Sequence, residues 1–176
     1  MFNKIIIGLI ITCLFPALTF AHGPARQKVI QEIEINAPVE KVWNIISDFC
    51  SIKDWNPQVA GCEITEGNPS EAGAIRVITL ENGQTLKEKL IKLVPEQNKI
   101  QYMLTEPNIE AFPINTHGST IQLSDESGKT KVVWKGAFYR SFPGPNPPPE
   151  LSDEAGQKAL SGFYSAGLEK IKTLAE

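Results

Sequence analysis

The chain has few residues of the kinds that bind metal ions or form covalent intermediates. Only two histidines and three cysteines occur among its 176 residues, without CxxC or HExxH spacing. Its glycines form no phosphate-binding loop of the dinucleotide or P-loop type, and no serine lies in a GxSxG turn. These absences exclude the common signatures of metal, nucleotide and serine-nucleophile sites, so we expect no cofactor.

An excess of positive charge and a long apolar run are also missing. The chain has 17 Lys and Arg against 20 Asp and Glu, a formal net charge of −3, and its lysines are scattered between acidic residues. Nucleic acid is therefore not an expected partner. The apolar run from Ile5 to Phe20 is interrupted by Pro16. Because a membrane-spanning helix needs roughly 18 or more unbroken apolar residues, we expect no stable membrane insertion.

The same apolar run has the features of a secretory signal peptide. Lys4 precedes it, and Thr19-Phe20-Ala21 ends it with a small–x–small cleavage pattern. We expect a signal peptide over residues 1–21, a flexible mature N-terminus over 22–28 and a single domain over 29–176. Cys13 lacks the small-residue context of a lipoprotein site, so no lipid anchor is predicted.

Two cysteines, Cys50 and Cys62, remain after the expected cleavage. In an oxidising compartment they can form a disulfide that closes a short loop and adds about 2–3 kcal/mol of stability. Alternatively, they are two small buried apolar residues that never meet. The sequence leaves both possibilities open.

The order of apolar periods predicts one α+β domain. An alternating strand at 29–35 leads into an amphipathic helix, and the Trp55-Asn56-Pro57 turn follows. A long amphipathic helix begins near Ser152 or Asp153. The expected strands between them cover residues 59–66, 74–81, 84–94, 99–105, 117–124 and 131–140. This order predicts a curved antiparallel sheet of about seven strands wrapped around the C-terminal helix.

The Asn82-Gly83 turn determines which side chains face that helix. A two-residue turn would place Arg76 against Lys89, a repulsive pair. A three-residue loop with Gly83 in the left-handed position moves the register by one and places Arg76 opposite Glu88 on an otherwise apolar face. We prefer this register because it pairs opposite charges. The pair is then either a contact at the rim that fixes the register or a polar anchor for a ligand.

Alternation along the later strands adds further candidates to the concave face. His117 has no obvious Ser or Cys partner, so we interpret it as a hydrogen-bonded wall residue rather than an acid–base catalyst. Gly136 marks either a bend or a close approach of the final helix. The gap between sheet and helix is the expected site. The predicted ligand-binding residues are Trp55, Arg76, Glu88, Tyr102, His117, Trp134, Phe138 and Arg140.

A proline-rich stretch at 143–149 separates the last strand from the final helix. One interpretation is a stiff strap between these two elements, because polyproline conformation needs no internal hydrogen bonds. The other is an exposed aromatic-plus-proline surface for a partner protein.

Several segments resemble a known superfamily. APVEKVW, DWNP and GAIRVITLENGQTLKEKL are similar to START/Bet v 1-like (SRPBCC) proteins of the polyketide cyclase/dehydrase kind. The ending WKGAFYRSFPGPNPPPELSDEAGQKALSGFYSAGLEKIK resembles the narrower MxaD-like periplasmic proteins of methylotrophic bacteria, and the likeness covers about 29–172. It implies a helix-grip fold with two short helices near the start, a cavity for a small hydrophobic molecule and a periplasmic location. For the narrower group it also implies assistance to methanol dehydrogenase and its cytochrome. Asn56 stands where that group has histidine.

We therefore expect a non-enzymatic periplasmic protein that binds a small hydrophobic ligand. Two alternatives stay open. One is an interaction protein for a periplasmic dehydrogenase or cytochrome, without a ligand. The other is a cyclase or dehydratase that uses Glu88 or His117 as acid–base.

Overall fold

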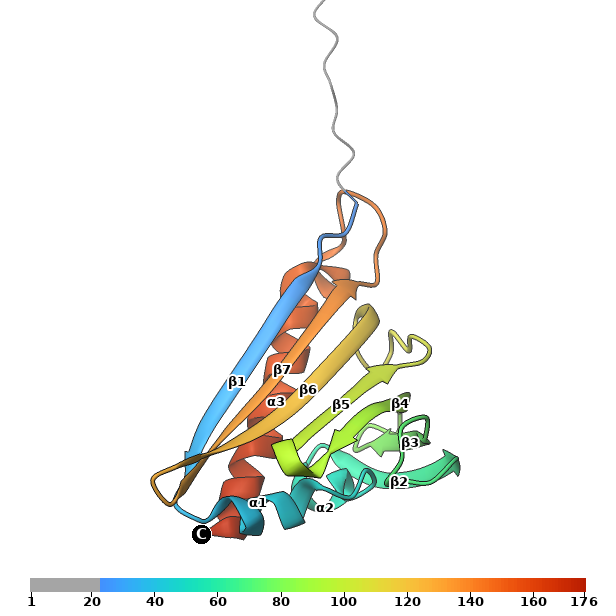
Figure 1. Ribbon diagram of the computed structural model, residues 1–176. Coiled ribbons are helices and arrows are strands. Elements are labelled where there is room, and N and C mark those ends of the chain that lie inside the picture. Colours follow the sequence, from blue (N-terminus) through green and yellow to red (C-terminus); the bar gives the residue numbers. More distant parts are fainter. Residues whose placement is uncertain (1–22) are drawn as a thin grey trace, which may run out of the picture.

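The computed structural model describes residues 23–176, so the predicted signal peptide lies outside the described residues (Figure 1). All seven described strands form one antiparallel sheet in the order β1-β7-β6-β5-β4-β3-β2. The predicted α+β architecture is therefore confirmed. The main elements are β1 (Gln27–Ile35), α1 (Val39–Ile46), α2 (Ile52–Trp55), β2 (Val59–Glu66), β3 (Ile75–Leu80), β4 (Thr85–Val94), β5 (Lys99–Leu104), β6 (Ile114–Glu126), β7 (Lys129–Arg140) and α3 (Asp153–Ala175).

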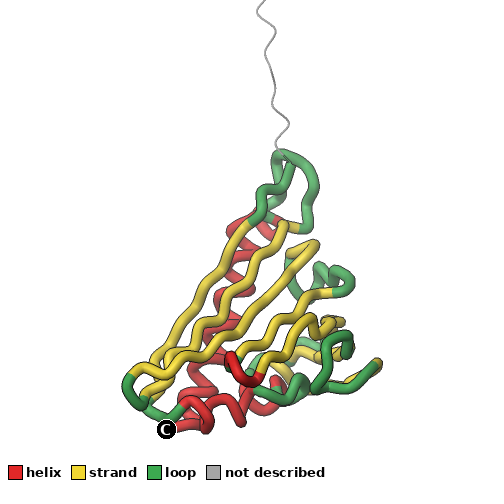
Figure 2. Tube along the Cα trace, in the orientation of Figure 1, coloured by secondary structure: helices red, strands yellow, loops and turns green. Residues whose placement is uncertain are grey.

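The molecule has two layers. α3 runs along one face of the sheet, and α1 and α2 lie near its C-terminal end (Figure 1). The loop between β7 and α3 lies at the opposite end of the sheet (Figure 2). The concave face of the sheet therefore meets α3, and none of the three α-helices of residues 23–176 lies over the opposite face (Figure 1).

None of the helices formed by residues 23–176 is long and apolar enough to cross a membrane.

The β3–β4 hairpin has the predicted three-residue loop. Leu80 N donates to Gln84 O at 2.8 Å, and Gly83 has φ +82°, the left-handed conformation that glycine adopts without strain. As a result Arg76 lies directly opposite Glu88. Both charged side chains are turned toward the concave face with the buried apolar residues of the two strands.

Glycines let α3 approach the sheet closely. A Cβ atom on Gly136 of β7 would collide with the Tyr164 hydroxyl and lie 2.9 Å from His117 Nε2. A Cβ on Gly167 of α3 would lie 2.9 Å from the Trp134 ring. Of the two interpretations of Gly136, the close approach of the helix is confirmed.

The ends of some elements differ from the expectation. β1 begins at Gln27, inside the stretch predicted to be flexible, because Gln27 and Lys28 pair with Phe138 and Ala137 of β7. Sequence periodicity does not predict the two additional residues of β1, because they are ordered by their pairing with β7. The start of α3 agrees with the expectation: Ser152 caps the helix, and its hydroxyl accepts a hydrogen bond from Ala155 N at 3.2 Å.

Candidate functional site

A buried ion pair lies on the concave face of the sheet. Arg76 and Glu88 are only 3% and 4% exposed. Arg76 Nε and Nη2 donate to Glu88 Oε2 at 2.8 and 2.7 Å, and Nη1 donates to the carbonyl oxygen of Phe49. The guanidinium carbon lies 4.1 Å from the centroid of the Phe49 ring and 4.9 Å from that of Tyr102. The pair therefore lies inside the molecule, and the interpretation as a contact at the rim is wrong.

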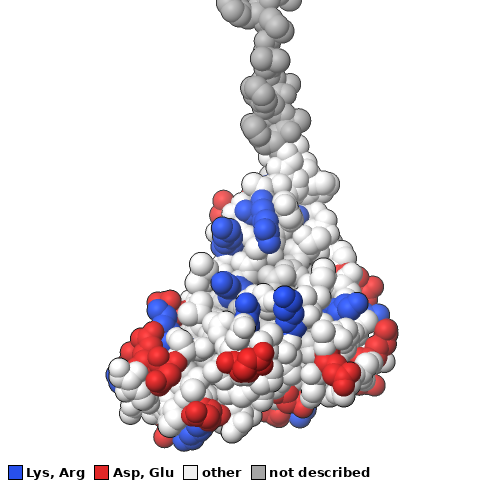
Figure 3. All heavy atoms as spheres, viewed as in Figure 1, with Lys and Arg blue, Asp and Glu red and all other residues white. Residues whose placement is uncertain are grey.

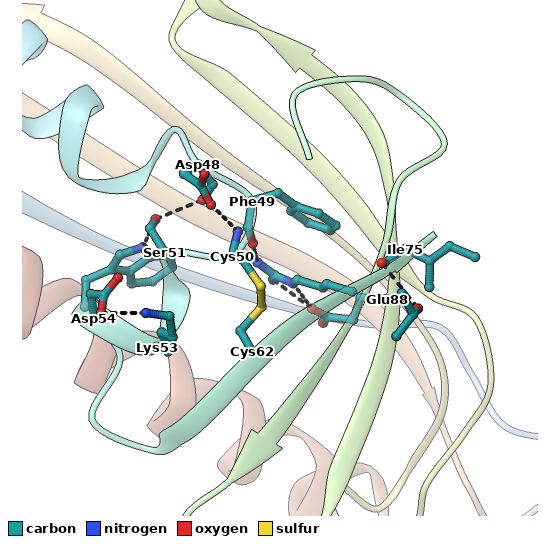
Figure 4. The surroundings of a disulfide bond; sticks show 12 residues. Asp48, Phe49, Cys50, Ser51, Lys53, Asp54, Cys62, Ile75 and Glu88 are labelled. Atoms are coloured by element: carbon teal, nitrogen blue, oxygen red, sulfur yellow. Dashed lines mark hydrogen bonds and ion pairs between the residues drawn. A yellow bond between two sulfur atoms is a disulfide. The ribbon is translucent and has the colours of Figure 1, made fainter. Parts of the chain in front are cut away.

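A disulfide holds the segment that supplies the Phe49 carbonyl. Cys50 and Cys62 are bonded, with a Cα–Cα distance of 5.6 Å, which settles the alternative left open by the sequence (Figure 4). Cys50 N also donates to Asp48 Oδ1 at 2.7 Å. The bridge ties the connection after α1 to β2, beside the ion pair.

Loss of this disulfide should destabilise the fold. For Cys50→Ser/Cys62→Ser we expect the free energy of unfolding to fall by about 2–3 kcal/mol, because the unfolded chain is no longer constrained. Urea unfolding of the wild type with and without a reductant measures this. The double variant is the control, since reductant should leave it unchanged. Equal stability of oxidised and reduced wild type would contradict the prediction.

A network of hydrogen-bonded side chains adjoins the ion pair. Trp134 Nε1 donates to Ser119 Oγ at 2.8 Å and to Tyr102 Oη at 3.1 Å. Tyr164 Oη of α3 lies 3.0 Å from Ser119 Oγ and 2.6 Å from His117 Nε2. The structure thus brings three predicted residues, Tyr102, His117 and Trp134, into one cluster around the hydroxyl groups of Ser119 and Tyr164.

Ser119 and Tyr164 were not predicted as site residues. Ser119 shares the inward face of β6 with His117, so strand alternation could have identified it. Tyr164 lies on the buried face of α3 among apolar residues, where its hydroxyl needs a partner. Gly136 was the sequence feature that pointed to this placement, because a residue without a side chain leaves room for the Tyr164 hydroxyl.

Burial sets the protonation of the network. It lowers the pKa of His117 to about 4, and it raises the pKa values of Tyr102 and Tyr164 above their usual range. All three groups are therefore neutral near pH 7. The network is suited to hydrogen bonding with a polar group, and His117 is a weak base at this pH.

The shifted pKa of His117 makes stability depend on pH. Its value of about 4 in the folded protein lies below the ordinary 6.5, so the unfolded chain binds an extra proton between these values. The contribution of His117 is present above pH 6.5 and is lost as the pH falls toward 4, by up to about 3 kcal/mol. Urea unfolding of wild type and His117→Gln across this range should show a steeper loss for the wild type. Parallel curves would contradict the assignment.

Aromatic side chains fill the space between sheet and helix. The Trp134 and Tyr164 rings are stacked, with centroids 4.2 Å apart. Trp55 and Phe163 pack on Trp134 at 5.4 and 5.8 Å. The open gap expected from the sequence is thus occupied by these side chains, and Trp55 is a buried neighbour of Trp134.

Asn56 has a structural role in the Trp55 turn. Its Nδ2 donates to the Phe163 carbonyl of α3 at 3.1 Å, and its Oδ1 accepts from Gln58 N at 3.1 Å. The side chain is 1% exposed. The residue that departs from the MxaD-like pattern therefore fastens the turn to the helix.

Phe138 and Arg140 lie farther along β7, outside the polar cluster. Phe138 packs beneath Gly156 near the start of α3. Arg140 pairs with Asp153 at 3.0 Å and donates to the carbonyls of Phe142 and Gly144 at 3.0 and 2.6 Å. Arg140 thereby ties the proline-rich segment to the beginning of α3, which supports its interpretation as a strap. Within residues 23–176 no group of three or more His, Cys, Asp or Glu side chains could hold a metal ion.

An antiparallel sheet that grips a long C-terminal helix, with polar groups buried between them, defines the helix-grip class of proteins. The profile of the polyketide cyclase / dehydrase and lipid transport family matches residues 26–176, and the chain belongs to this family.

Solved structures agree with this assignment. XoxI from Bacillus cereus is 28% identical over 84% of this chain and 94% of its own, with a TM-score of 0.71. A protein from Bacillus thuringiensis is also 28% identical, over 84% of this chain and 97% of its own, with a TM-score of 0.69. Major latex-like protein 151 from Panax ginseng shares the fold at 13% identity, covering 85% of this chain and 97% of its own, with a TM-score of 0.67.

Proposed function

We propose that this protein binds a small, mainly apolar molecule between the sheet and α3, with the polar end of the ligand facing Arg76, Glu88 and Tyr102. The buried ion pair is the observation that carries the proposal. Replacing such a pair by apolar residues of similar volume is often neutral or stabilising, so a pair kept inside an apolar core indicates a role beyond stability. The family description, which includes lipid transport, supports the same class of ligand.

The ligand displaces aromatic side chains as it binds. Trp134 and Tyr164 are stacked over the network, and Phe112 from the β5–β6 connection packs on Phe163 with centroids 5.4 Å apart. Rotation of these rings uncovers the hydroxyl groups of Ser119 and Tyr164. The aromatic walls then bury the apolar part of the ligand while the charged pair orients its carbonyl, hydroxyl or carboxylate.

The proposed location is the periplasm. The apolar N-terminal run with its cleavage pattern supports export. The Cys50–Cys62 bridge also supports it, because disulfides persist in oxidising compartments. The resemblance to MxaD-like proteins suggests that the ligand-binding domain assists a periplasmic dehydrogenase and its cytochrome.

The surroundings of Glu88 and His117 favour binding over turnover. Both donated bonds of the Arg76 pair end on Glu88 Oε2. His117 is held neutral by burial, with a pKa of about 4. At neutral pH His117 is therefore a weak general base, and the Glu88 carboxylate is held in its ion pair with Arg76.

Thermal unfolding with dodecanoate, dodecanol and a small aromatic ketone tests the proposal. At a hundred times its dissociation constant, a bound molecule should raise the free energy of unfolding by about 2.7 kcal/mol. Arg76→Met and Tyr102→Phe should each weaken binding of the molecule that stabilises the wild type. Lys131→Met, on the outer face, is the control and should bind as the wild type does. Unchanged affinities in Arg76→Met would refute the anchoring role of the pair.

A further inference from the structure

The face of the sheet turned away from α3 carries a trough. A hollow of about 530 Å³ follows β6, and a second of about 380 Å³ adjoins it over β7 and β1. The floor consists of small residues on neighbouring strands: Gly118 lies opposite Ala137 of β7 and Met103 of β5, and Ala137 lies opposite Lys28 of β1. Because the two central positions have almost no side chain, the trough is bounded by the longer side chains on either side.

Exposed apolar side chains form part of its walls. Ile30, Ile91, Met103 and Tyr139 are 59%, 37%, 44% and 39% exposed. All four line one hollow or the other. Methionine and tyrosine are enriched at protein–protein interfaces relative to other surfaces. This grouping of apolar residues over a bare sheet face is typical of a surface that a partner covers.

Basic residues also line the trough, together with the uncharged polar residues Gln101, Thr116 and Thr120. Arg26, Lys28 and Lys135 line the hollows, and no acidic residue lines either of them. None of these three cations forms an ion pair with the described residues, whereas Lys129 and Lys131 on the same face pair with Glu34 and Glu32 at 2.6 and 3.1 Å. Several basic side chains are visible across this face (Figure 3). Unpaired like charges gathered around a trough attract an anionic partner.

We propose that the trough binds an acidic amphipathic helix of a partner protein. The walls extend from Ile91 of β4 to Ile30 of β1, four strand spacings or roughly 19 Å, which is wide enough for a helix whose diameter with side chains is about 10–12 Å. A helix laid on a bare sheet face adds a layer in the way that helices cover sheets within domains. The leucines of such a helix contact the apolar walls and its acidic flank meets the three cations.

Other occupants fit less well. A small molecule would stay mostly solvated in an open trough, since ligand pockets bury most of the ligand. A flat bilayer surface would contact the walls of the trough but would not reach its floor at Gly118 and Ala137. A second copy of this chain would have to present a different surface, and such head-to-tail contacts propagate into rings or filaments.

The test uses a fluorescein-labelled peptide of about 15 residues made of Leu, Ala and Glu, long enough to form a helix. Its leucines have i, i+3, i+4 spacing, and a second peptide has Lys in place of Glu. Fluorescence anisotropy should show binding of the acidic peptide only. Arg26→Glu/Lys28→Glu/Lys135→Glu should weaken it by about tenfold or more. The matched control Lys41→Glu/Lys158→Glu/Lys170→Glu changes the net charge equally, at exposed positions on α1 and α3, and should bind as the wild type does.

A second variant tests the shape of the site without changing its charge. A Cβ on Gly118 meets no atom within 4 Å, so Gly118→Leu fills the trough without disturbing the fold. It should also weaken binding, whereas Gly162→Leu, likewise open to solvent on α3, should not. Equal binding of both peptides, equal losses in the two charge-reversal variants, or full affinity in Gly118→Leu would each overturn the proposal. Binding to vesicles of anionic lipids that Gly118→Leu leaves intact would replace the helix with a membrane surface.

Discussion

Arg76→Met is expected to lower the free energy of unfolding by about 3–5 kcal/mol. The change leaves the Glu88 carboxylate buried without its cation, and it removes the donor to the Phe49 carbonyl. Both side chains of the pair are at most 5% exposed, so solvent does not screen the loss. Urea unfolding at neutral pH measures the difference.

Two further variants isolate the effect of the charge. Arg76→Met/Glu88→Leu removes both charges and should recover most of the lost stability, since no unpaired ion remains. Lys131→Met removes an exposed partner of Glu32 and should change stability by less than about 1 kcal/mol. A loss in Arg76→Met no larger than that in Lys131→Met would contradict the buried placement of the pair. If the double variant is stable and still binds the ligand with wild-type affinity, the Arg76–Glu88 pair does not anchor the ligand.

Trp134→Ala should also cost about 3–5 kcal/mol. The Trp134 ring is fully buried, it stacks on Tyr164, and its Nε1 supplies hydrogen bonds to Ser119 and Tyr102. Truncation removes these contacts and leaves a cavity between sheet and helix. Chemical denaturation followed by circular dichroism measures the loss.

The cavity left by Trp134→Ala also reports on the proposed site. Indole should bind in it and restore part of the stability, because engineered apolar cavities accept aromatic guests. The control is Trp43→Ala on α1, where the ring is only partly buried and the loss should be smaller, with no response to indole. If indole stabilises both variants alike, or neither, the space between sheet and helix does not accept a guest in this way.

Features fixed by local chemistry could be predicted from the sequence. The Asn82-Gly83 turn determined the hairpin register, and with it the contact between Arg76 and Glu88. Strand alternation placed Tyr102, His117 and Trp134 on one face, and the helical period of α3 identified its buried side. The compartment suggested by the N-terminal run made a disulfide plausible, although the sequence did not show that Cys50 and Cys62 come close.

Features that depend on distances between elements could not be predicted. The Phe49 carbonyl reaches Arg76 only because the chain after α1 folds over the sheet. The role of Arg140 depends on the path of the proline-rich segment and on Asp153. Whether the space between α3 and the sheet is open or filled depends on the distance between them. The periodicity of the sequence gives no information about that distance. The trough on the outer face arises from two small residues on neighbouring strands, Gly118 and Ala137, which lie side by side only through the β6–β7 register.

The glycine at position 136 has a consequence for comparing relatives. Since not even a methyl group fits there beneath the Tyr164 hydroxyl, the separation of the two layers is at its lower limit at this point. A family member with a bulkier residue at the equivalent position has to hold its C-terminal helix farther out, and it thereby encloses more empty volume. The residue at this position should therefore distinguish relatives with a small cavity between sheet and helix from relatives with a large one. The relatives with the large cavity should bind larger ligands.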